Sequence, residues 1–181
     1  MTIRRRNWFL LGVLVACAAC FAAAAPAPNN DLPTVAYVDL HRYLGRWYEI
    51  ARYPNRFEKD GDRDITATYS LRPDGRIAVL NASAHANGKP ETASGWAKVD
   101  DAKSNAKLRV TFFWPFFGNY WILELGQNYE YAVVGEPARK YLWILSRTPQ
   151  MNEATYRGIV QRLYSAGYDS SRLIRVQQTS H

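Results

Sequence analysis

Few side chains in this sequence could serve as catalytic nucleophiles, general bases or metal ligands. Its two cysteines, Cys17 and Cys20, both lie near the N-terminus, and we find no nucleophile elbow and no phosphate-binding loop. The three histidines are far apart and lack the spacing of a metal site: His41, His85 and His181. The sequence therefore predicts a protein that is not an enzyme and that needs no metal ion and no cofactor.

Carboxylates are the remaining candidates for chemistry. Asp60, Asp62 and Asp64 alternate in a loop, as calcium ligands can, but no bidentate glutamate or accompanying loop pattern follows them. We therefore interpret them as solvated charges. Glu49 is expected in a strand, and on an inward face it would be buried. A buried carboxyl group more often satisfies a neighbour than catalyses.

The first 25 residues are typical of an export signal, with a charged start, a short apolar run and small residues after it. The four residues that end at Cys17, Leu-Val-Ala-Cys, resemble a bacterial lipobox, in which the cysteine is lipidated and becomes the mature N-terminus. We therefore expect a lipid anchor on Cys17, a tether over residues 26–37 and, because Ala18 follows, sorting to the periplasmic side of the outer membrane. Cleavage near Ala25 would instead give a soluble periplasmic protein.

Composition narrows the class of protein further. The 181 residues are enough for one domain with a real core, expected over residues 38–178. The formal charge is +7, but the basic residues are scattered and interleaved with acidic ones. A nucleic-acid binder needs them clustered on one face, so we exclude that function. Aromatic residues make up 14% of the chain, which favours half-buried strands and apolar pockets.

Alternating apolar and polar residues predict eight short strands separated by turn signals such as Pro73-Asp74-Gly75 and Asn87-Gly88. Eight consecutive antiparallel strands close most economically as an up-and-down barrel, which leaves no free edge. We therefore predict an all-β fold of this kind. The expected strands are 46–53, 65–71, one restarting at 77–79, 91–99, 107–114, 119–125, 129–135 and 140–146.

The period of the pattern changes near the C-terminus. Apolar residues at helical spacing predict one helix of about 13 residues, with Asn152 as its N-cap and Gly167 as its stop. Residues 173–176 can return as a short final strand. The apolar stripe of the predicted helix consists of Tyr156, Ile159, Val160, Leu163 and Tyr164.

Strand alternation also predicts which side chains line the inside of the barrel. Many of them are small and leave room beside large ones. An eight-stranded barrel holds either packed side chains or one small ligand, and the small residues favour a cavity. The inward set is Ala67, Tyr69, Val79, Asn81, Ala93, Gly95, Ala97, Val99, Leu108, Val110, Phe112, Trp121, Leu123, Leu125, Ala132, Val134, Tyr141, Trp143 and Leu145.

The aromatic segment 112–118 contains a proline and cannot be strand throughout. Its apolar rings are expected at a rim of the barrel. They would form a lid or mouth that meets acyl chains, a membrane or a partner, which includes a second copy of the chain. The alternative is a hydrophobic hairpin that folds back on the barrel.

Ordered motifs in this chain resemble those of the lipocalins, and within them the bacterial lipoprotein members. The resemblance runs from about Val38 to Gln178. One departure is Gly126-Gln127-Asn128, where the second lipocalin signature has Thr-Asp-Tyr. The matching stretches are Gly45 to Arg52, Tyr120 to Leu123, Tyr131 to Val134 and Tyr141 to Pro149.

The resemblance implies structural roles for three residues: Gly45 and Trp47 at the closed end of the barrel, and Arg147 packed over the indole ring. It also implies that the cavity binds an amphipathic lipid, either a fatty acid such as palmitate or a lysophospholipid. The head group would lie near the open end, and the role would be lipid storage or transport in the cell envelope. The alternatives are another small hydrophobic ligand, a lipocalin-type enzyme and an interaction module such as a homodimer.

Overall fold

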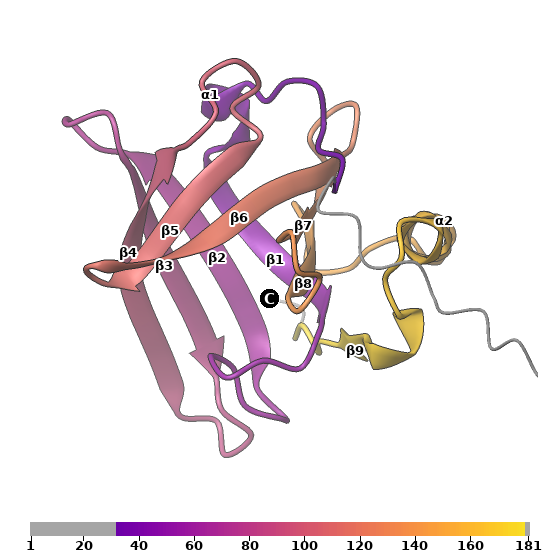
Figure 1. Ribbon diagram of the computed structural model, residues 1–181. Coiled ribbons are helices and arrows are strands. Elements are labelled where there is room, and N and C mark those ends of the chain that lie inside the picture. The colour runs from indigo at the N-terminus through magenta and orange to yellow at the C-terminus, as the bar shows by residue number, and fades with distance from the viewer. Residues whose placement is uncertain (1–31, 180–181) are drawn as a thin grey trace, which may run out of the picture.

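The computed structural model of this protein describes residues 32–179, in which nine antiparallel strands form one sheet rolled into a barrel (Figure 1). The sheet order is β2-β3-β4-β5-β6-β7-β8-β1-β9, and a further pairing of β1 with β2 closes the ring. The predicted eight-stranded barrel, with one C-terminal helix and a short last strand, is confirmed. The strands are β1 (Gly45–Arg52), β2 (Arg63–Leu71), β3 (Ile77–Ala84), β4 (Pro90–Val99), β5 (Lys107–Phe113), β6 (Phe116–Leu125), β7 (Tyr131–Gly135), β8 (Leu142–Ser146) and β9 (Ile174–Arg175).

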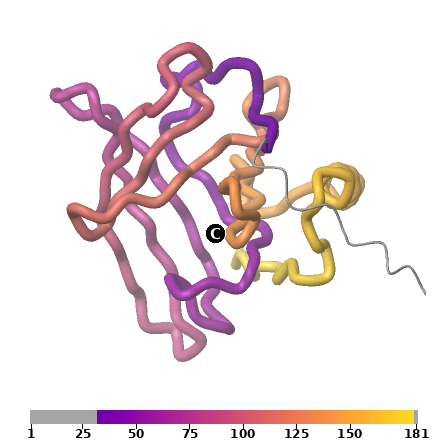
Figure 2. Tube along the Cα trace, viewed as in Figure 1, coloured from indigo at the N-terminus to yellow at the C-terminus, as the bar shows by residue number. Residues whose placement is uncertain are grey.

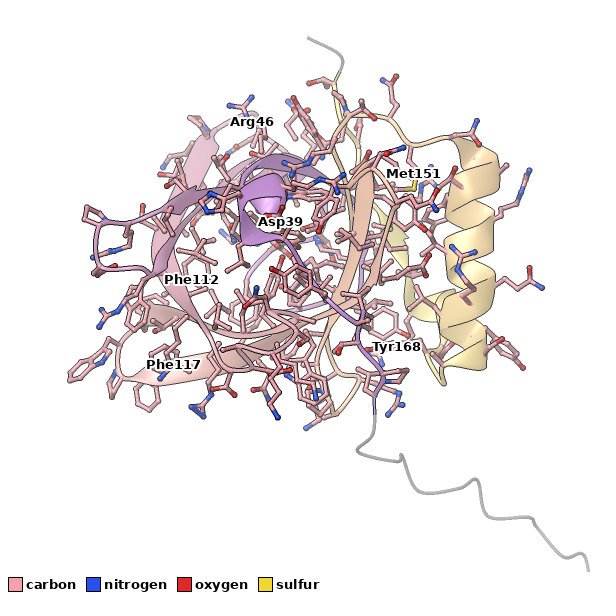
Figure 3. The ribbon with its side chains drawn as sticks, turned by 90° about the horizontal axis from the view of Figure 1, so that it is seen from above. Asp39, Arg46, Phe112, Phe117, Met151 and Tyr168 are labelled. Carbon is pink, nitrogen blue, oxygen red and sulfur yellow. The ribbon has the colours of Figure 1, made fainter. Side chains whose placement is uncertain are left out.

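A short helix, α1 (Leu40–Tyr43), lies over one end of the barrel (Figure 3). Its N-cap is Asp39, whose carboxylate accepts hydrogen bonds from the backbone N–H groups of His41 at 2.9 Å and Arg42 at 3.3 Å. The Asp39 N–H in turn donates to the hydroxyl of Tyr129 at 2.8 Å, beyond the end of β6. These bonds fix the chain where it crosses the barrel and enters β1.

The second helix, α2 (Glu153–Ser165), packs against the outside of the barrel (Figure 1). The prediction that Asn152 caps it is confirmed, because its side chain accepts from the N–H of Ala154 at 2.9 Å. Ile159 and Leu163 are buried, whereas Tyr164 is 71% exposed, so the apolar face is narrower than predicted. A turn of 3-10 helix, η1 (Ser170–Arg172), leads from α2 to β9.

The buried side chains form two separate cores on the two faces of the curled sheet. One core fills the closed end of the barrel interior and contains Val38, Tyr43, Trp47, Tyr69, Ile77, Val79, Ala97, Ala106, Leu108, Ile122, Ala132, Val134 and Leu145. The other lies between the outer wall and α2 and contains Leu32, Ile50, Ala51, Tyr53, Val133, Leu142, Ile144, Ile159, Leu163 and Tyr168.

The first described residues lie along the outside of the barrel, on the side that carries α2 (Figure 2). Leu32 is buried in the outer core, and the Val35 N–H donates to the Ile122 carbonyl at 3.1 Å. Residues 32–37, predicted to be a tether, are therefore packed on the barrel. The predicted export signal, Cys17 and the rest of the tether lie outside the described residues. Over residues 32–179, no helix is long and apolar enough to cross a membrane.

Candidate functional site

The closed end of the barrel is built around Trp47, which is completely buried. Its indole N–H donates to the carbonyl of Tyr43 at 2.8 Å, and this bond ties the start of β1 to the end of α1. The guanidinium carbon of Arg147 lies 3.8 Å from the centre of a Trp47 ring, within the range of a strong cation–π contact. Gly45 has a φ of +94°, and a side chain there would also crowd an Arg147 nitrogen at 3.3 Å.

Arg147 also satisfies backbone carbonyls that α1 and β1 leave free. It donates to the carbonyl of Arg42 at 2.6 Å, of Arg46 at 3.0 Å and of Tyr43 at 3.2 Å. One planar side chain therefore joins the end of β8 to α1 and to the start of β1. Such a forked set of donors is a property of guanidinium that lysine lacks.

Three tyrosines form the polar part of the closed end. The hydroxyl of Tyr120 lies 2.7 Å from that of Tyr43 and 2.9 Å from that of Tyr69. Burial raises the pKa of Tyr43 and Tyr120 well above the ordinary phenol value, and that of Tyr69 to about 12. All three hydroxyls are therefore neutral near pH 7 and form a short hydrogen-bonded chain in an apolar setting.

Strand pairing shows which predicted residues face inward, because directly paired residues share a face of the sheet. Val79 pairs with Tyr69 and Gly95, and Val134 pairs with Trp143, and these pairs contribute to the inner core. The inward prediction holds in this way for Ala67, Tyr69, Val79, Asn81, Ala93, Gly95, Ala97, Val99, Leu108, Val110, Phe112, Leu125, Ala132, Val134, Trp143 and Leu145. Tyr141 stacks on Trp143, with ring centres 5.8 Å apart.

The inward prediction is wrong for Trp121 and Leu123. Both side chains pack in the outer core, Trp121 with the Lys107 ammonium 4.3 Å from its ring centre. A bulge between Ile122 and Glu124 shifts the register of β6, so Tyr120 and Ile122 face inward instead while Leu125 still does. The prediction applied strict alternation around an outward Glu124, which cannot account for this extra residue.

Part of the inner surface remains accessible on one side of the barrel. The pairing of β4 with β5 runs from Trp96 to Val99, so β4 extends well beyond it (Figure 1). Along the extended part, Ala93 is exposed, and Gly95 and Asn81 are partly exposed although they face inward. Further inward residues that keep some exposure are Ala67, Val110, Phe112 and Trp143. The apolar interior is thus filled at the closed end, while several inward side chains away from that end keep contact with solvent.

Two charged residues of β1 also face the interior. Glu49 pairs with Leu145 and Arg52 pairs with Trp143, and a bulge between them brings both to the same face. Both side chains are buried, and the Arg52 Nε lies 3.3 Å from a Glu49 oxygen. The sequence predicts a buried Glu49 if its strand face points inward, but it gives no such indication for Arg52. Strand alternation places a residue three positions after Glu49 on the opposite face, so the sequence pattern carries no signal for Arg52.

The loop between β1 and β2 is tied to this pair by a chain of polar contacts. Arg52 donates to the Lys59 carbonyl at 2.9 Å and lies 3.2 Å from a Glu58 oxygen. Asp62 accepts from the Lys59 N–H at 2.9 Å and lies 2.8 Å from His85. Burial alone would raise the pKa of Asp62, but its hydrogen bonds to His85 and to the Lys59 N–H outweigh burial and lower the pKa. The interpretation of Asp62 as a solvated charge is therefore wrong.

Burial raises the pKa of Glu49 well above its ordinary value of 4.5, and the negative charge of Glu58 adds to the effect while Arg52 opposes it. The negative charge of Glu49 also contributes to the raised pKa of Tyr69. A carboxyl group whose pKa is raised by folding binds its proton more tightly in the folded state. Its contribution to stability is therefore complete below pH 4.5 and is lost as the pH rises through the folded-state pKa.

We expect Glu49→Gln to remove this loss. Glutamine keeps the shape of the protonated carboxyl group and cannot ionise, so the free energy of unfolding of the variant should fall less above pH 4.5 than that of the parent. Urea denaturation across a pH series measures the difference. Parallel stability curves for the two proteins would contradict a buried Glu49 that titrates on unfolding. Glu153→Gln, at an exposed position of α2, is the matched control.

The aromatic segment 112–118 comprises the end of β5, a tight turn and the start of β6, and its rings point in different directions. Phe112 packs in the inner core, and Phe117 packs on the outer wall against Trp96, with ring centres 5.1 Å apart. Figure 3 labels both residues. The three rings at the turn itself are 75% to 80% exposed: Phe113, Trp114 and Phe116. The alternative in which this hairpin folds back on the barrel is therefore wrong for its tip.

The arrangement can hold an apolar molecule, with polar contacts available at two depths. One is the tyrosine chain near the closed end, and the other is the Glu49–Arg52 pair nearer the open end. Among residues 32–179, no three His, Cys, Asp or Glu side chains lie together in a way that could hold a metal ion. A barrel that is closed at one end and keeps an accessible apolar interior defines a class of proteins that bind small hydrophobic molecules.

A family model described as a lipocalin-like domain matches residues 38–178, and the chain belongs to this lipocalin family. It is 44% identical over 159 residues to temperature-induced lipocalin-1 of Arabidopsis thaliana, covering 83% of this chain and 85% of that protein. It is 40% identical over 173 residues to outer membrane lipoprotein Blc of Escherichia coli K12, covering 93% and 97%. Mouse apolipoprotein D is 35% identical over 158 residues, covering 82% and 81%.

The solved structures support the same fold. Insecticyanin of the tobacco hornworm, Manduca sexta, superposes with a TM-score of 0.65 at 24% identity, covering 83% of this chain and 86% of that one. The cockroach allergen Per a 4 superposes with a TM-score of 0.63 at 20% identity, covering 81% and 92%. At these identities the likeness concerns the barrel and not the ligand.

Proposed function

We propose that this lipocalin binds a single-chain amphipathic lipid, a fatty acid or a lysophospholipid, in its barrel. The observation that carries the proposal is an inner surface of apolar side chains that stays accessible beside Trp143 and Phe112. Burying an acyl chain there contributes about 0.8 kcal/mol per methylene group. We propose binding and not catalysis because the sequence contains no nucleophile elbow and no cysteine between residues 32 and 179.

The same proposal includes a place in the cell envelope. Support comes from the likeness to outer membrane lipoprotein Blc over 93% of this chain, and from the lipobox-like residues that end at Cys17. A lipid chain on Cys17 would hold the protein at the periplasmic side of the outer membrane. The function would then be storage or transport of lipid at that surface. Mass spectrometry of the mature N-terminus tests the anchor, and an unmodified N-terminus near Ala25 would contradict it.

Tryptophan fluorescence tests the lipid-binding proposal directly. Titration with palmitate or lysophosphatidylcholine should change the emission of the parent protein to saturation, because Trp143 lies in the accessible interior. Trp143→Phe should lose most of that change. Trp121→Phe is the matched control, because Trp121 lies outside the barrel and should leave the change intact. A parent protein whose emission is unaffected by both lipids would contradict the proposal.

The exposed turn supports a second candidate function, an interaction module. Phe113, Trp114 and Phe116 present a small cluster of apolar rings to solvent, which is uncommon without a contact to make. A second copy of the chain is one such contact. Sedimentation of the parent and of Trp114→Ser at increasing concentration tests it. Association that the substitution abolishes would support a homodimer through this turn, and a monomer at all concentrations would exclude one.

A further inference from the structure

A buried arginine stands among the apolar inward side chains of β1 and β8. Arg52 is 1% exposed and pairs with Trp143 across the two strands. Only its Nη2 makes a hydrogen bond within the part of the chain that the structure describes, to the Lys59 carbonyl. Nε and Nη1 are buried without one. A buried charged donor without an acceptor is costly, so this guanidinium has unused capacity to bind an anion.

The two carboxylates beside Arg52 do not complete its hydrogen bonds. Its Nε lies 3.3 Å from a Glu49 oxygen and 3.2 Å from a Glu58 oxygen, yet neither contact has the alignment of a hydrogen bond. An ideal arginine–carboxylate pair is a fork of two parallel, shorter bonds. A better-placed oxyanion could therefore replace a glutamate as the partner of Arg52.

The two glutamates differ in how firmly they are held. Glu49 belongs to a paired strand and is fixed beside Leu145. Glu58 lies in the loop between β1 and β2 and keeps a side-chain exposure of 14%; apart from its contacts with Arg52 and Glu49, it is held by Asn55 of the same loop. Glu58 can turn towards solvent without disturbing the barrel. Of the two, Glu58 is the carboxylate that a ligand can displace.

We propose that Arg52 binds the acidic head group of the lipid, a carboxylate or a phosphate, which takes the place of Glu58. This inference rests on the proposed function and adds the residue that binds the head group of the ligand. The acyl chain would run from Arg52 past Trp143 towards the closed end, because Trp143 shares the inward face directly beside Arg52. Displacement of Glu58 would also release one of the contacts that hold the β1–β2 loop.

The raised pKa of Glu49, which burial causes first and Glu58 second, is consistent with this arrangement. A protonated Glu49 can donate its O–H to the oxyanion beside Arg52 and does not compete for the guanidinium. The charged groups beside this position are Glu49 and Arg52 from β1 and Glu58 from the loop, and the Glu49 charge also acts on Tyr69 in the closed end.

Three ligands with the same alkyl chain separate head-group binding from acyl burial: dodecanoate, dodecyl phosphate and dodecanol. We expect the parent to bind both anions more tightly than the alcohol. In Arg52→Met the Kd of the anions should rise about tenfold or more, as expected for loss of a charge-assisted pair, while that of dodecanol changes less than about twofold. The anion that loses more identifies the source, a fatty acid or a phosphorylated lipid.

Two further variants keep the test decisive. The double variant Glu49→Gln/Arg52→Met also removes the carboxylate that would otherwise be left buried without its partner. It should show the same selective loss of anion affinity. Glu58→Gln removes the competing charge and should tighten anion binding about threefold, with dodecanol unchanged. Arg76→Met is the matched control, since Arg76 lies on the outer wall over Trp96. It should bind all three ligands as the parent does.

The outcomes separate this inference from the proposed function. Equal losses for anions and alcohol in both Arg52 variants would show that Arg52 acts only on the fold and would overturn the inference. Anion binding that Glu58→Gln weakens would overturn it as well. A parent that binds dodecanol with the same affinity as the anions would overturn the inference and leave the lipid-binding function standing. A parent that binds none of the three would overturn both.

Discussion

Arg147→Ala should lower the free energy of unfolding by about 3 kcal/mol, as the sum of a desolvated cation–π contact and charge-assisted hydrogen bonds. The guanidinium lies 3.8 Å from the centre of a buried Trp47 ring and donates to three carbonyls of α1 and β1. Without it, the carbonyls of Arg42 and Arg46 lose this donor, that of Tyr43 keeps the Trp47 indole N–H, and the fully buried indole loses its cover. The loss should appear as a lower melting temperature and a lower urea midpoint.

Two variants show whether geometry or charge is responsible. Arg147→Lys keeps the charge but loses the flat stack and the fork of donors, so we expect it to recover less than half of the loss. Arg76→Ala removes another cation–π contact, in which the guanidinium lies 4.3 Å from the centre of a Trp96 ring but is largely exposed. It should cost less than about 1 kcal/mol. An Arg147→Ala protein as stable as the parent would contradict this structural role.

The Arg147→Ala variant also separates the stability of the fold from ligand binding. Trp47 and Arg147 belong to the closed end and face the tyrosines of α1, β2 and β6, below the accessible part of the interior. Ligand affinity per folded molecule should therefore survive Arg147→Ala. The contact between Trp47 and Arg147, which is typical of the family, therefore stabilises the fold of this protein and carries little information about the ligand.

The sequence predicted the interior well where strands are regular. Between β3 and β4 the pairing runs without interruption from Ile77 and Ala97 to Ala84 and Pro90, so simple alternation assigns every side chain to the correct face. The prediction failed in β6, where one additional residue between Ile122 and Glu124 exchanges the two faces. Glu124 was placed outward correctly and pairs with Arg162 of α2, but Leu123 beside it points outward too.

The bulge in β1 had a larger consequence for the candidate site. Alternation from Trp47 and Glu49 would place Arg52 outside, and a charged residue at a strand end is normally read as solvated. The register shift between Glu49 and Ala51 turns it into the barrel instead. A bulge depends on how two strands fit together across the barrel, which is information that one strand's own pattern does not contain. Arg52 could therefore be recognised only in three dimensions.

A second prediction with a large expected effect concerns the affinity for palmitate and follows from the accessible interior. Ala67 faces inward, pairs with Trp47 and Asn81, and is not fully buried. Ala67→Phe should place a ring where the acyl chain would lie. Displacing two or three methylene groups costs about 2 kcal/mol, so the Kd for palmitate should rise about thirtyfold. Fluorescence titration of the variant against the parent measures this.

The neighbouring position on the same strand provides the matched control. Thr68 lies on the opposite face of β2 from Ala67 and Tyr69, so Thr68→Phe adds the same ring to the outside of the barrel. It should bind palmitate as the parent does. Melting curves of both variants must show a folded protein, since crowding the interior costs about 1–3 kcal/mol. If both variants bound palmitate with the parent's affinity, the lipid would have to bind outside the barrel, and the aromatic turn of Phe113, Trp114 and Phe116 would be the next surface to test.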